Sequence, residues 1–174
     1  MKVFLNILVT ALLMNMELIC GNTGLALGLP LFGAVYFFIA FSPVHGITSA
    51  AFSALLLDAM YARNCLTWPL AAIVIVSAAG NFAGYLERRM PLSPLGSGGL
   101  CALLVSVYNV LNAWFSGVPA PGPDFFSMLV FQVSGGGLFM LLLVWLFDAV
   151  NFRCNLPQFH IIENGKHRFS GGRL

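Results

Sequence analysis

Apolar runs recur along nearly the whole chain, and polar residues gather in the gaps between them. The runs cover 3–20, 24–42, 46–61, 66–85, 100–116 and 125–150. A helix rises about 1.5 Å per residue and the hydrocarbon layer is about 30 Å thick, so roughly 20 apolar residues cross it. The pattern predicts an all-α polytopic membrane protein with six transmembrane helices. The third run gives only about 24 Å of helix, so a re-entrant segment is the alternative there.

Composition supports a membrane protein independently of the pattern. Hydrophobic residues make up 59% of the chain, charged residues only 8%, and the mean hydropathy is +0.90. A soluble domain carries about a quarter charged residues, so a water-soluble surface cannot be built from this composition. The net charge is only +2 and the basic residues form no long run, which argues against a nucleic-acid partner. The lipid bilayer is therefore the expected surrounding.

The basic residues indicate an orientation. With six spans, seven of them fall on the side of the two termini and only Arg63 falls on the other. The seven are Lys2, Arg88, Arg89, Arg153, Lys166, Arg168 and Arg173. By the positive-inside rule both termini are predicted to be cytoplasmic. The predicted organisation is a single transmembrane domain, residues 1–153, followed by a short cytoplasmic tail, residues 154–174.

The four cysteines show no metal or redox spacing. The topology places Cys20 and Cys65 at the outer face, where an oxidising compartment could join them, and Cys101 and Cys154 near the cytoplasm. Free apolar thiols are the favoured alternative to a disulfide. The sequence predicts no cofactor and no metal.

Small and polar residues recur at helical spacing within the later spans. Amides and hydroxyls at such positions form hydrogen bonds between helices, and glycines allow close approach. Helix contacts are therefore favoured over a solute cavity at the centre of the bundle. The predicted contact residues are Gly80, Asn81 and Gly84 in the fourth span, Asn109 and Asn112 in the fifth, and Gln132 in the sixth.

Two carboxylates lie near the predicted outer ends of helices. Glu17 is expected to be hydrated there, because helix ends near the interface are wet. For Asp58 two alternatives stay open: a solvated end group, or a carboxylate bonded to Arg63 or to an amide of the fifth span. We rank Asp58 among the residues that mediate helix or partner contacts.

Catalytic motifs are absent from the sequence. It contains no Ser-x-x-Lys, no Gly-x-Ser-x-Gly, no His-Glu-x-x-His and no phosphate-binding loop. The three histidines, His45, His160 and His167, fall in a predicted short loop and in the tail, where a solvated surface role is expected. The chain is predicted not to be an enzyme.

Three features between residues 29 and 153 resemble a known family. The apolar segment 53–61 contains Asp58, the fourth span closes with Gly84-Tyr85-Leu86-Glu87-Arg88-Arg89, and the last span runs directly into Arg153. Together with the length and the six short helices, these features resemble MreD, the rod shape-determining membrane protein.

The resemblance implies a non-enzymatic scaffold of the bacterial cell-elongation machinery, in the inner membrane. Its fold would be similar to that of the substrate-binding components of energy-coupling-factor transporters. An MreC-like membrane protein is the expected partner, and MreB, RodA and a penicillin-binding protein are looser ones. The alternative function is a substrate-binding subunit of a vitamin transporter of that kind. An ion channel is disfavoured, because the sequence contains no ring of charges and no carbonyl-filter motif.

Single-cysteine labelling tests the topology. A cysteine at Asn164, in a background without the native thiols, should be inaccessible to an impermeant reagent added to intact cells, because the bias of basic residues places the tail inside. Labelling should require permeabilised cells. Reaction in intact cells at the rate of an outer-loop control would contradict the orientation.

Overall fold

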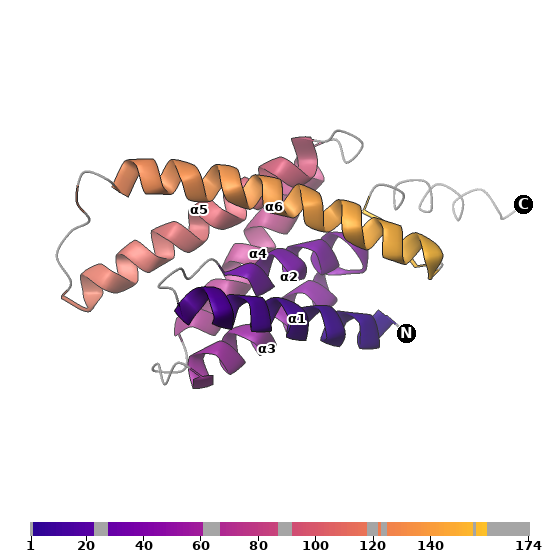
Figure 1. The fold of residues 1–174 in the computed structure, drawn as a ribbon, viewed down its shortest axis with the longest axis horizontal. Coiled ribbons are helices and arrows are strands. Elements are labelled where there is room, and N and C mark those ends of the chain that lie inside the picture. Colours follow the sequence, from indigo (N-terminus) through magenta and orange to yellow (C-terminus); the bar gives the residue numbers. More distant parts are fainter. Residues whose placement is uncertain are drawn as a thin grey trace, which may run out of the picture.

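The chain forms an all-helical array in which successive helices run in alternating directions (Figure 1). The computed structural model describes residues 2–22, 28–60, 67–86, 92–117, 122, 125–154 and 156–159. The helices are α1 (Lys2–Asn22), α2 (Leu29–Ala40), α3 (Pro43–Met60), α4 (Thr67–Tyr85), α5 (Leu92–Phe115) and α6 (Phe125–Arg153). The start of α1 and the end of α6 lie on the same side of the array, at the right of Figure 1. The predicted fold class, all-α, is confirmed.

Three of these helices, α4, α5 and α6, are long and apolar enough to cross a membrane. Helix α2 has 12 residues and is only about 18 Å long, which is too short to cross the hydrocarbon layer alone. The structure thus agrees with a membrane protein, and the six-span topology stays a prediction.

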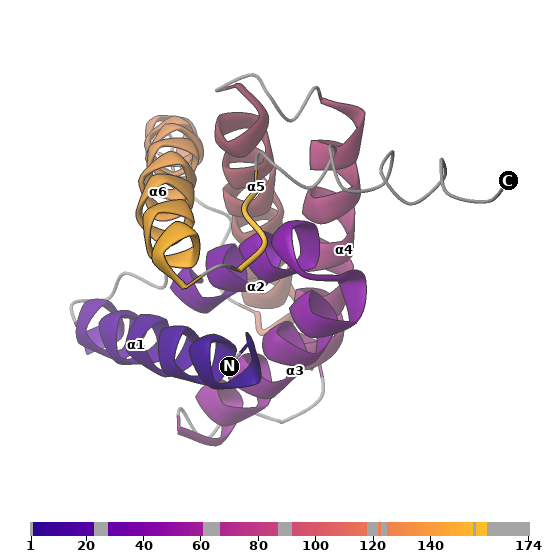
Figure 2. The ribbon, with the colours of Figure 1, turned by 90° about the vertical axis from the view of Figure 1, so that its right-hand side faces the viewer.

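Helix α2 is the centre of the array. It contacts all five other helices, and Figure 2 shows it surrounded by them. Every residue of α2 except Phe38 is buried. A helix that is apolar on all sides belongs in the interior of a bundle, where every face meets another apolar surface.

The start of α2 is held by a carboxylate from α1. Gly28 adopts a left-handed conformation with φ 69°, and Glu17 accepts hydrogen bonds from the N–H groups of Gly28 and Leu29 at 3.0 and 2.9 Å. Glu17 is only 4% exposed. The expectation of a hydrated Glu17 is therefore wrong, because the first N–H groups of a buried helix need acceptors that its own backbone cannot supply.

Close packing between α5 and α6 begins before residue 100, where the fifth apolar run starts in the sequence. Helix α5 itself begins at Leu92. A proline is tolerated in a first helical turn, so Pro94 does not interrupt it. A Cβ at Gly98 would collide with Met140, and one at Gly136 would lie 2.6 Å from the Cβ of Ala102. These glycines let the two backbones approach.

Of the two glycines predicted to form helix contacts on the fourth span, one packs against Phe38. Its side chain lies against Gly80 of α4, and its backbone lies against Gly46 of α3, so that a Cβ at either glycine would collide with it. Gly84 differs, because a Cβ there would meet nothing within 4 Å. The tight contact expected at Gly84 is not formed within the described part of the chain, since this position faces outward.

Replacing Gly80 by leucine should lower the thermal stability of the protein in detergent. The new side chain would have to displace the Phe38 ring, and overpacking of this kind costs roughly 1–3 kcal/mol. Gly84→Leu is the matched control, because it adds the same side chain on the same helix in open space. Equal losses of melting temperature in the two variants would contradict this packing.

Candidate functional site

The polar residues predicted for helix contacts divide between the inside and the outside of the array. Gln132 of α6 meets Ser106 of α5, whose hydroxyl donates to Gln132 Oε1 at 2.6 Å. Asn109 is half-buried on α5, whereas Asn112 on α5 and Asn81 on α4 are exposed. Within the described residues, only Gln132 forms a side-chain hydrogen bond to another helix among these amides.

Asp58 is only 1% exposed, so the alternative of a solvated end group is wrong. Arg63, one of the suggested partners of Asp58, lies outside the described residues, as does Cys65, so the alternative ion pair and the less favoured disulfide with Cys20 also lie outside them. The other two cysteines are thiols: Cys101 is buried in the core and Cys154 is half-buried. His45 is not in a loop but in the first turn of α3, where Nδ1 lies 2.7 Å from Ser42 Oγ.

A buried polar cluster that sequence analysis missed joins α2 to α6. The Tyr36 hydroxyl donates to Asp148 Oδ1 at 2.8 Å and accepts from Asn151 Nδ2 at 2.7 Å. Tyr36 and Asn151 are fully buried. The cluster lies in the second half of α2 and near the end of α6, on the side of the molecule where α6 ends (Figure 1).

The same cluster holds the segment that follows α6. The Phe159 N–H donates to Asp148 Oδ1 at 2.9 Å, and Asn151 Nδ2 donates to the Pro157 carbonyl at 3.0 Å. The Phe159 ring is fully buried and stacks on Tyr36, with ring centroids 6.4 Å apart. Residues 156–159 therefore pack onto the helical array, although the tail was expected to begin at 154.

A sequence signal for this cluster existed. Asp148 and Asn151 are three residues apart, so they share a helix face; Asp148 interrupts the apolar run of the last span, and Asn151 follows directly after it. Ionisable groups in such a run are functional candidates by default. The partner Tyr36 gave no comparable signal, because it is more than a hundred residues away and belongs to a run of apolar and aromatic residues.

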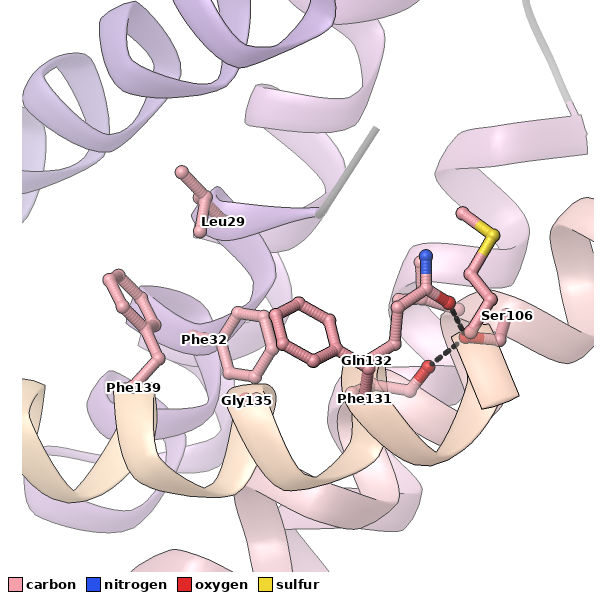
Figure 3. A pocket seen from close by; sticks show the side chains of 11 residues that line it. Leu29, Phe32, Ser106, Phe131, Gln132, Gly135 and Phe139 are labelled. Atoms are coloured by element: carbon pink, nitrogen blue, oxygen red, sulfur yellow. Dashed lines mark hydrogen bonds between the residues drawn. The ribbon is translucent and has the colours of Figure 1, made fainter. Parts of the chain in front are cut away.

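A lateral pocket of about 300 Å³ lies between α2, α5 and α6. Its wall is apolar except at Ser106 and Gln132, which meet at one end of it (Figure 3). The lining residues are Leu29 and Phe32 from α2, Ala102, Val105 and Ser106 from α5, and Met128, Phe131, Gln132, Gly135, Gly136 and Phe139 from α6. This volume lies at the lower end of the range of about 300–1,000 Å³ typical of ligand sites.

The described residues contain no group of three or more His, Cys, Asp or Glu side chains that could hold a metal ion. The two features that the structure assembles are a hydrogen-bonded cluster around Tyr36 and an apolar pocket with one amide. Both are suited to holding something in place: the cluster holds the segment 156–159, and the pocket has the shape and lining of a binding site.

No protein-family model, no curated protein and no solved structure matches the chain. The resemblance to MreD therefore depends on the sequence features given above.

Tyr36→Phe tests the buried cluster. Removing the hydroxyl takes a donor from Asp148 and an acceptor from Asn151, which should cost about 1–3 kcal/mol and loosen the segment 156–159. Hydrogen exchange at the Phe159 amide should accelerate, and the melting temperature in detergent should fall. Tyr108→Phe is the control, because that hydroxyl makes an exposed bond to Thr67. Unchanged exchange at Phe159 would show that the cluster does not hold this segment.

Proposed function

We propose that this protein is a non-enzymatic scaffold of the bacterial cell-elongation machinery, embedded in the inner membrane with both termini cytoplasmic. It acts through lateral helix contacts with an MreC-like membrane protein and, more loosely, with MreB, RodA and a penicillin-binding protein. The motifs around Asp58, Arg88 and Arg153 support the choice of machinery. The arrangement of polar groups on the outside of the helices supports the mode of action.

One observation carries the proposal: an amide on the outward side of α4 has no side-chain hydrogen-bond partner among the residues that the structure describes. Ser77, Asn81 and Gly84 fall on one face of the helix, which we call the α4 outer face. Asn81 is exposed and forms no side-chain hydrogen bond with the described residues, while Gly84 beside it leaves open space. In hydrocarbon an amide without a partner is unfavourable, and a glycine next to it lets another helix come close. The α4 outer face is therefore a docking surface for a helix of a partner protein.

A second outward amide extends this argument to α5. Asn112 is exposed near the end of that helix and likewise forms no side-chain hydrogen bond with the described residues. Two helices that can cross a membrane thus carry exposed amides, as expected for a protein that binds partner proteins laterally through its helices.

A substrate-binding subunit of an energy-coupling-factor transporter is the second candidate, and the pocket between α2, α5 and α6 is the observation that favours it. Its wall offers only the hydroxyl of Ser106 and the amide of Gln132 for a polar solute. A water-soluble vitamin needs more hydrogen-bonding groups than these, so we rank this function below the scaffold.

Purification in mild detergent with identification of bound proteins distinguishes the two functions. We expect recovery of an MreC-like protein. We also expect Asn81→Leu to reduce that recovery several-fold, because it removes the side-chain amide that would form a hydrogen bond with the partner helix. Asn15→Leu is the matched control, because Asn15 is also exposed on a helix but bonds to the carbonyl of Ala11 in its own turn.

One outcome would contradict the scaffold function, and another would contradict the docking surface. Recovery of ATPase subunits in place of an MreC-like protein would indicate the transporter. Equal recovery from the Asn81 and Asn15 variants would show that the α4 outer face does not bind the partner.

A further inference from the structure

The pocket between α2, α5 and α6 opens sideways, on the face that lipid would cover. Three of its lining residues on α6, namely Met128, Phe131 and Gly135, are exposed, and Phe131 is 78% exposed. The opposite wall is buried and includes Phe32 and Val105. A chain-like molecule can therefore enter from the side of α6 and reach the buried wall.

One hydrogen-bond donor in the pocket has no acceptor within the described residues. Gln132 Oε1 lies 2.6 Å from the Ser106 hydroxyl, which also lies 2.8 Å from the carbonyl oxygen of Ala102, whereas Gln132 Nε2 makes no hydrogen bond there. Figure 3 shows this nitrogen directed away from the Ser106 hydroxyl. A hydrogen bond to this amide N–H is strongly favourable in apolar surroundings, because a donor without an acceptor there has a large desolvation cost.

The position of Gln132 along α6 suggests which acceptor is available. Helix α6 has 29 residues and is about 43 Å long, so it exceeds the hydrocarbon layer and both ends project into the interfaces. Gln132 lies seven residues, or about 10 Å, from the start of α6. This depth is close to the edge of the hydrocarbon layer, where the ester groups of glycerolipids lie.

Water is a poor occupant of this pocket. A buried water molecule needs about two to four polar partners, and the two polar side chains of the wall, Ser106 and Gln132, already bond to each other, which leaves only Gln132 Nε2 without a partner among the described residues. A lipid chain has no such requirement. It also gains little by moving from one apolar environment to another, since lipid tails are as apolar as leucine. The free amide, rather than the apolar wall, would therefore select the occupant.

We propose that this pocket binds one acyl chain of a membrane glycerolipid, whose ester carbonyl accepts a hydrogen bond from Gln132 Nε2. The chain enters beside Phe131 and Gly135 and lies against Phe32 and Val105. This site is separate from the α4 outer face, so it would persist if the proposed partner were wrong.

Photolabelling of the full-length protein in vesicles tests the site. The vesicles contain dioleoyl phosphatidylethanolamine and dioleoyl phosphatidylglycerol with a trace of a phospholipid that carries a diazirine in one chain. Labelled residues are located by mass spectrometry. We expect labels on the buried lining residues Phe32 and Val105 in addition to the exposed faces, because only a chain inside the pocket can reach the former. Labels confined to exposed residues such as Trp145 would overturn the proposal.

Two variants make the test specific. Gly135→Leu fills the mouth of the pocket without a collision, since a Cβ at Gly135 has nothing within 4 Å, and should reduce labelling of Phe32 and Val105 several-fold. Gly84→Leu is the matched control, because it has the same open surroundings on α4, away from the pocket, and should leave that labelling unchanged. Equal labelling in the two variants would overturn the site.

The hydrogen bond is tested with an ether-linked probe that lacks the carbonyl. Relative to the ester probe, it should label the buried wall between roughly twofold and tenfold less, as expected for one hydrogen bond of ordinary strength. Gln132→Leu should abolish this difference, whereas Ser106→Ala should preserve it, because the Nε2 donor remains. An ester-to-ether ratio that is the same in the wild type and in Gln132→Leu would overturn the role of Gln132.

Discussion

The carboxylate of Glu17 at the start of α2 is the interaction on which the rest of the structure depends. Helix α2 is short, apolar and buried on all sides, so water cannot reach its first N–H groups. Glu17 accepts from two of them, and each donor left without a partner would cost about 1–3 kcal/mol. Because all five other helices pack on α2, a charge that is unfavourable in a membrane becomes useful at this position.

The buried polar group in the second half of α2 also receives its hydrogen bonds from another helix. Tyr36 is the one residue of this helix with a polar side chain, and its hydroxyl is both donor and acceptor in the cluster with Asp148 and Asn151. Because the Tyr36 hydroxyl is bonded both as donor and as acceptor, a shift of α2 against α6 would leave one of these groups without its partner, which favours one arrangement of the two helices. The cluster thereby also sets the path of the chain beyond α6, through the bond to Phe159.

Elsewhere the helices are held together by close apolar packing. Gly46 and Gly80 receive Phe38, and Gly98 and Gly136 bring the backbones of α5 and α6 together. In a membrane the apolar surface gains little by leaving lipid, so close contact and dispersion carry the packing. Because close contact stabilises helix packing in a membrane, glycines that make no such contact are candidate binding positions. Gly84 and Gly135 make no such contact with the described residues, and they lie on the two surfaces proposed for a partner helix and for a lipid chain.

The sequence by itself determined the class of fold and the approximate extent of most helices, because long apolar runs admit few structures in a bilayer other than helices. It also marked Gly80 and Gln132 as contact residues, since small and amide residues stand out in such runs. Only the tertiary structure decided which glycine is packed, that Glu17 and Asp58 are buried, and that Asp148 meets Tyr36. These outcomes depend on which helix faces which, and apolar faces of nearly uniform character carry little information about their neighbours. The polar contacts join residues 11 to 115 positions apart, and no local pattern in the sequence specifies such pairs.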